Sequence, residues 1–217
     1  MTNITKLFLF ITFELLTIGL SGQSTTKKLA KVIPQLSIYN INGDTTNLKT
    51  ISDGKITFID FWFIPCGPCF NEMNMLHKLY AKYKDNPKIS FLTITLTDSA
   101  FARPLIENRN TPVNDTYDYF RSLAQLDTFK LPVYFIKNGT RKMLSLKEEK
   151  GGGFNGHGEP SVQNQSLYPA DVFGFSAYPT IFIFDKSGKV IYTKTGFMKG
   201  TEAKQQKNIE AIINDKL

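Results

Sequence analysis

The stretch from Phe58 to Cys69 reads FIDFWFIPCGPC and contains both cysteines of the protein. Its first half is apolar and aromatic apart from Asp60, which is typical of a strand buried on both faces. Two prolines and a glycine follow, and apolar residues at helical spacing come after them, so a tight turn and then a helix are expected. Two cysteines separated by two residues at such a junction indicate thiol–disulfide chemistry.

The overall composition is that of a globular protein. The chain has 217 residues, of which 41% are hydrophobic and 21% charged, enough for a core of ordinary size. The formal net charge of +7 comes from scattered lysines and arginines, without a basic stripe interleaved with aromatic residues. This pattern argues against nucleic acid as a partner.

The N-terminus has the three parts of a secretory signal peptide, which we assign to residues 1–22. Lys6 is followed by an apolar run from Leu7 to Leu20 and then by small residues, with cleavage expected after Gly22. The run is short for a spanning helix. Glu14 interrupts it, so an uncleaved membrane anchor stays open as an alternative.

Export changes how the cysteines are interpreted, because exported proteins meet an oxidising environment. A disulfide between residues three apart closes a very small loop and stabilises the fold little. A redox role therefore explains the pair better than a structural one.

The rest of the chain alternates between strand and helix patterns, which predicts one α/β domain over residues 33–217 with a mixed sheet and helices on its faces. Strands are expected at 33–41, 45–48, 56–63, 89–96, 131–136, 178–184 and 190–195, and helices at 70–83, 117–124 and 201–217. The first two strands form an N-terminal hairpin around Asn42 and Gly43. Residues 97–113 are expected to be irregular, and residues 138–170 to form a long surface insertion.

The position of each cysteine suggests its role. Cys66 should lie where the strand ends and the helix begins, where unpaired N–H groups and the helix dipole favour a thiolate. Cys69 should lie inside the helix and be more buried, so Cys66 attacks a partner disulfide and Cys69 resolves the mixed disulfide. Asp60, in an apolar strand, is the candidate acceptor of the Cys69 proton; the alternative is an acid that hydrogen-bonds locally in the core.

Three motifs together resemble the thioredoxin superfamily: Asp60-Phe61-Trp62, the Cys-Gly-Pro-Cys sequence at 66–69, and Tyr178-Pro179-Thr180. The leader, the N-terminal hairpin, Gly54-Lys55 and Glu72 are more similar to its exported TlpA/ResA branch. The resemblance covers residues from 33 to the C-terminus except the insertions. It implies a thioredoxin fold and an extracytoplasmic thiol–disulfide oxidoreductase, with a preference for reduction suggested by the Gly-Pro dipeptide.

The resemblance also implies roles for individual residues. Cys66 and Cys69 would be the redox pair, with no other cofactor and no metal, and Asp60 the buried acid. Pro179 would be a cis-proline facing the disulfide and would present the backbone of Tyr178 to an extended partner segment. Trp62, Gly67 and Pro68 are the other residues expected to bind the partner.

Relatives of this branch often have an additional acid near the site. The candidates here are Glu72 and Asp98, although the position of Glu72 also suits an exposed helix residue. Asn74 stands where a helix-kinking proline is frequent in the family, so that kink is in doubt.

The implied partners are disulfide-bearing exported proteins and a membrane electron donor, and the implied location is periplasmic or otherwise extracytoplasmic, for a monomer. Two other classes of function can be compared with this one. A metal site lacks ligands, because only His77 and His157 accompany the cysteines. A non-catalytic binding or adaptor module of the envelope is the main alternative, and the cysteines, Asp60 and Pro179 argue against it.

Overall fold

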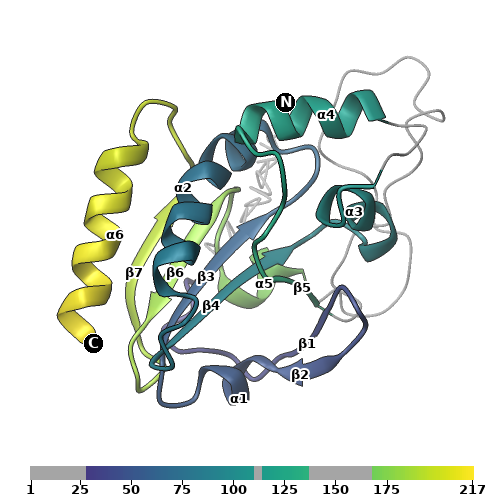
Figure 1. The fold of residues 1–217 in the computed structure, drawn as a ribbon. Helices are drawn as coiled ribbons and strands as arrows, with labels where there is room; N and C mark the ends of the chain where they lie inside the picture. Colours follow the sequence, from purple (N-terminus) through teal and green to yellow (C-terminus); the bar gives the residue numbers. More distant parts are fainter. Residues whose placement is uncertain (1–27, 110–113, 137–167) are drawn as a thin grey trace, which may run out of the picture.

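The computed structural model describes residues 28–109, 114–136 and 168–217 (Figure 1). The expected signal peptide lies outside the described residues, and so does most of the expected insertion. Its last residues are described: the helix α5 (Pro169–Phe173) begins within the range that we had assigned to the insertion.

Seven strands form one mixed sheet in the order β2-β1-β5-β4-β3-β6-β7. Their bounds are β1 Ser37–Asn40, β2 Thr45–Asn47, β3 Ile56–Trp62, β4 Ile89–Thr95, β5 Val133–Ile136, β6 Thr180–Phe184 and β7 Val190–Thr195. The central strand β3 pairs in parallel with β4 and antiparallel with β6. Every residue of β3 is buried, as its apolar sequence predicts.

Helices cover both faces of the sheet (Figure 1). The larger core cluster joins one face of the sheet to α2 (Gly67–Tyr83), α3 (Ser99–Ile106), α4 (Asn114–Ala124) and α6 (Glu202–Lys216). The smaller cluster, on the opposite face, includes residues from α1 (Leu48–Ser52) and the end of α5. The chain therefore has the predicted α/β architecture, and it is a thioredoxin fold with an N-terminal β-hairpin.

Besides α5, two helices differ from the sequence prediction. The prediction of irregular structure over residues 97–113 was wrong for its first part, where α3 forms despite Pro104. The Asp98 side chain caps α3 by accepting a 2.8 Å hydrogen bond from the Ala100 amide, and Ala102 and Leu105 are buried. Capping and burial offset the hydrogen bond that proline removes. The short helix α1 was not predicted at all.

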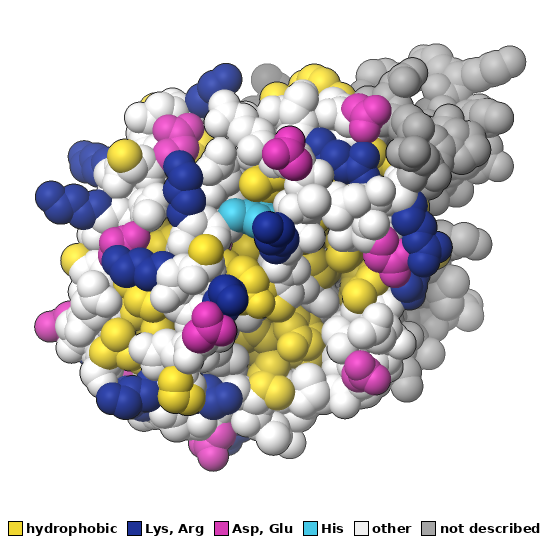
Figure 2. Space-filling model, viewed as in Figure 1, with side chains coloured by type: hydrophobic (Ala, Val, Ile, Leu, Met, Phe, Trp, Pro, Cys, Tyr) yellow, Lys and Arg dark blue, Asp and Glu magenta, His cyan; other side chains and the backbone are white. Residues whose placement is uncertain are grey.

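Lysine and arginine side chains are spread over the face shown in Figure 2 rather than gathered in a stripe. Apolar side chains gather in a hollow near the middle of that face. Within the described ranges, no helix has both the length and the apolar character needed to cross a membrane.

Candidate active site

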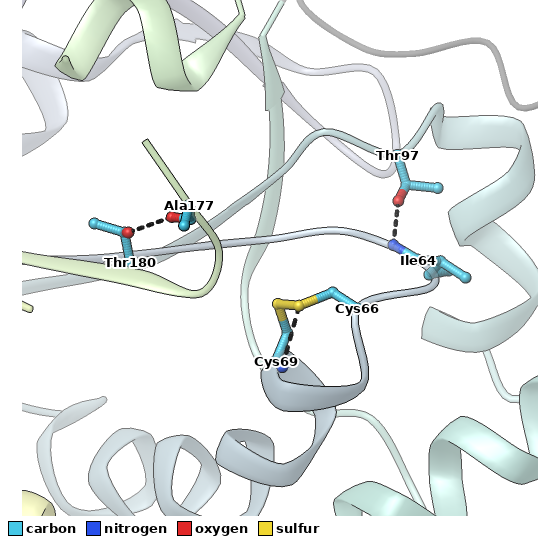
Figure 3. Close-up of a disulfide and its surroundings, with 6 residues drawn as sticks. All are labelled: Ile64, Cys66, Cys69, Thr97, Ala177 and Thr180. Atoms are coloured by element: carbon cyan, nitrogen blue, oxygen red, sulfur yellow. Dashed lines mark hydrogen bonds between the residues drawn. A yellow bond between two sulfur atoms is a disulfide. The ribbon is translucent and has the colours of Figure 1, made fainter. Parts of the chain in front are cut away.

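The two cysteines form a disulfide at the N-terminus of α2 (Figure 3). Cys66 is the N-cap of the helix, and its Sγ accepts a 3.2 Å hydrogen bond from the Cys69 amide. The exposed fraction is 5% for Cys66 and 1% for Cys69. Cys66 therefore lies at the strand-to-helix junction and is the less buried of the two, as predicted. This geometry favours a thiolate on Cys66 once the disulfide is reduced.

The loop between β3 and the disulfide is held from the end of the neighbouring strand. The Ile64 amide donates a 2.7 Å hydrogen bond to Oγ1 of Thr97, which is buried just beyond β4 (Figure 3). On the other side the ring of Phe63 meets that of Tyr178 edge-on, with centroids 5.2 Å apart. Sequence reasoning did not find Thr97, because its role depends on the parallel pairing of β3 with β4.

A turn from far along the chain completes the site (Figure 3). The Tyr178–Pro179 peptide is cis, which confirms that prediction. The Thr180 hydroxyl donates a 2.6 Å hydrogen bond to the Ala177 carbonyl, and the Gly196 amide donates one of 2.7 Å to the Pro179 carbonyl. These bonds fix the turn to the start of β6 and the end of β7.

Asp60 lies in the core beneath the dithiol. It alternates along β3 with Phe58 and Trp62, whose side chains belong to the same core cluster as both cysteines, so its carboxyl faces α2. Among the described residues, neither carboxyl oxygen has a hydrogen-bond partner of normal geometry. Burial and then the charge of Glu72 raise the pKa of Asp60 well above its ordinary value, and the Phe61 backbone opposes them. A carboxyl with such a pKa is suited to accept a proton near neutral pH.

The prediction that Glu72 is an exposed helix residue was wrong. Glu72 is only 1% exposed, one helical turn after Cys69, and its Oε1 accepts a hydrogen bond from Nε2 of Gln205. Burial raises its pKa to about 7, while the Gln205 bond and the charge of Lys194 lower it. The α2 helix turns Glu72 inward because its other neighbours on that face are core residues. Gln205 itself carried no signal in the sequence.

The remaining predicted site residues differ in their exposure and contacts. Trp62 is fully buried and packs against Phe70 and Phe129, so the structure corrects its assignment as a partner contact: it supports the site from below. Pro68 is exposed and Gly67 half-buried, whereas Pro179 is buried. Asp98, the second candidate acid, is the cap of α3.

His77 has a structural role in the fold. Its Nε2 accepts a 3.0 Å hydrogen bond from the Lys130 amide, and its Nδ1 lies 2.9 Å from the Met73 carbonyl. Both ring nitrogens are thus engaged by backbone groups. Within the described part of the chain, no three metal-ligating side chains come together, and His157 lies outside it.

Comparison of the sequence with known proteins supports a thiol–disulfide site. No family model matches the chain. The thiol–disulfide oxidoreductase ResA of Bacillus cereus is 24% identical over 189 residues, which cover 87% of this chain and 79% of the relative. The chain is a thioredoxin-like thiol–disulfide oxidoreductase that is similar to ResA over most of its length.

Two further comparisons concern a second relative and a solved structure. The thioredoxin-like protein YneN of Bacillus subtilis is 23% identical and covers 82% of this chain and 77% of its own length. A structure described as a thiol:disulfide interchange protein, DsbE, from Chlorobium tepidum superposes with a TM-score of 0.51 at 20% identity. The superposition covers 86% of this chain and 99% of the DsbE chain, and at 20% identity it shows only that the two share a fold.

Proposed function

We propose that this protein is an extracytoplasmic oxidoreductase that reduces disulfides of exported partner proteins. The observation that carries the proposal is the Cys66–Cys69 pair at the start of α2, above the buried carboxyl of Asp60. The expected leader at residues 1–22 supports the location, and the names of the relatives support the chemistry.

In the proposed reaction, the Cys66 thiolate attacks one sulfur of the partner disulfide, and the other partner sulfur leaves as a thiolate. Cys69 then loses its proton to Asp60 and attacks Sγ of Cys66. The mixed disulfide breaks, the partner leaves reduced, and Cys66 and Cys69 become the disulfide seen here. A membrane electron donor would reduce the pair again, and no other cofactor takes part.

Partner binding would involve the surface around the disulfide. Pro68, next to Cys69 in sequence, is exposed, and Gly67 and Tyr178 are half-exposed. Pro179 is buried and follows Tyr178 in the turn before β6. We propose that an extended segment of the partner lies along this turn and that the protein acts as a monomer.

The proposal predicts different outcomes for the two cysteines. Replacing Cys66 with Ser removes the nucleophile, so reduction of a model disulfide such as insulin should fall to the uncatalysed rate. Replacing Cys69 with Ser leaves attack intact but blocks resolution, so mixed disulfides with envelope proteins should accumulate and be visible on non-reducing gels.

The alternative, a non-catalytic adaptor of the envelope, predicts another result. Under that alternative, Cys69→Ser traps no partner and the wild-type chain does not reduce insulin above background. A Cys66→Ser/Cys69→Ser double variant is the matched control, because any partner that it still captures is bound without a thiol.

A further inference from the structure

The buried acid Glu72 is linked through Gln205 to a groove between β7 and α6. Gln205 comes from α6, is 5% exposed, and donates its Nε2 hydrogen bond to Oε1 of Glu72. The same Gln205 lines a groove of about 630 Å³ between β7 and α6, together with Tyr192, Lys194 and Asn208. Glu72 thus interacts electrostatically with Asp60 and is hydrogen-bonded to Gln205, which lines this groove.

The polar atoms of this cluster are incompletely satisfied. Among the described residues, Oε2 of Glu72 and Oε1 of Gln205 have no hydrogen-bond partner although both are buried. Buried polar atoms usually have partners, and exceptions often mark a functional site. The amide that binds Glu72 is therefore placed where the carboxyl still has an oxygen available for a proton.

The ionisable groups around Glu72 come from three sides. Asp60 approaches from β3, and its interaction with Glu72 raises the pKa of Asp60. Lys194 and Tyr192 approach from β7, where the Lys194 charge favours an ionised Glu72. The α6 helix contributes the neutral Gln205 and, on the wall of the groove, the exposed Lys204.

We propose that Gln205 is a positioning residue that holds Glu72 between Asp60 and the groove, so that the proton taken from Cys69 leaves by this route. The proton passes from the Cys69 thiol to Asp60, from Asp60 to Glu72, and from Glu72 to water in the groove. Both carboxyls return to their starting charge. Proton release is thereby separated from the face that a partner protein covers. This inference rests on the proposed function.

The test is the pH dependence of the second step of the reaction, measured as release of a mixed disulfide in stopped flow. Gln205→Met keeps the side chain's length and removes the donor. Loss of a hydrogen bond to a charged carboxyl raises the pKa of that carboxyl, so the midpoint of the profile should move up by about one pH unit. Formation of the mixed disulfide should keep its wild-type rate.

Two further variants make the result specific. Gln206→Met is the matched control, because Gln206 is next in α6 but binds Glu210 instead, and its profile should stay at the wild-type position. In a Glu72→Gln background, Gln205→Met should cause no additional shift, because Gln205 acts through Glu72. Lys194→Met removes a half-buried charge that lowers the pKa of Glu72, so it should shift the midpoint in the same direction as Gln205→Met.

An unchanged midpoint in folded Gln205→Met, or a shift that persists in the Glu72→Gln background, would overturn the proposal. If Gln205→Met does not fold, the Lys194→Met variant provides the test. An unchanged midpoint of its pH profile would contradict the proposed proton route. The proposed function fails separately, since its failure would be the absence of mixed-disulfide formation in every variant.

Discussion

At the scale of single residues, the most informative side chain is Asp60, an acid that is only 1% exposed. Asp60→Asn keeps the shape but cannot accept the Cys69 proton. General-base groups typically contribute a factor of about 10² to 10⁴, so we expect partner release to slow by roughly that factor. The first attack, by Cys66, should change much less. Equal slowing of the two steps in stopped flow would contradict the role.

The same variant has a second expected effect, on stability. Because the pKa of Asp60 is raised in the folded protein, the folded state binds more protons than the unfolded state above the ordinary aspartate value of 3.8. The free energy of unfolding of the wild type therefore falls as pH rises from there toward the raised pKa. Asp60→Asn lacks this loss, so its free energy of unfolding, measured by urea titration, should rise relative to that of the wild type as the pH increases above about 4.

At the scale of elements, one contact joins α2 to the segment before β5. His77 on α2 accepts a hydrogen bond from the Lys130 amide, and its ring meets Phe129, which in turn packs on Trp62. The segment thus reaches the strand that leads to the cysteines. Removing the imidazole leaves a backbone donor without its acceptor.

His77→Ala should lower the free energy of unfolding by about 0.5–1.5 kcal/mol at pH 7, the usual net contribution of one hydrogen bond. Burial lowers the pKa of His77, so protonation removes the acceptor and the wild-type advantage shrinks as pH falls below the ordinary value of 6.5. Urea titrations at pH 7 and pH 5 measure both effects. Lys78→Ala, the exposed neighbour, serves as the control, and a cost equal to that of His77→Ala would refute the contact's role.

At the scale of the whole molecule, the direction of electron flow is the property to measure. The Gly-Pro dipeptide between the cysteines is the one found in thioredoxin, so we expect a reducing protein. Equilibration with glutathione buffers should give a potential nearer to the value of about −270 mV for thioredoxin than to about −120 mV for DsbA. A potential near the DsbA value would make the protein an oxidant and reverse the proposed direction.

Much of this protein was predictable from local sequence. The apolar run of β3, the helical spacing after Cys69 and the proline at 179 specified the central elements and the redox pair. These features are visible because strand and helix periodicity, turn chemistry and cysteine spacing act over a few residues. The helix α3 was not predicted because Pro104 argues locally against a helix. The stabilising cap and the burial of α3 are seen only in the folded protein.

The candidate redox residues could be predicted from the sequence: two cysteines at a strand-to-helix junction, an acid in an apolar strand and a distant proline. Their surroundings became visible in the folded structure. Glu72 is buried because α6 packs over it, and Gln205 reaches it from 133 positions along the chain. Thr97 holds the loop because β3 and β4 lie side by side. Such contacts depend on how elements pack, and no pattern within one element specifies them.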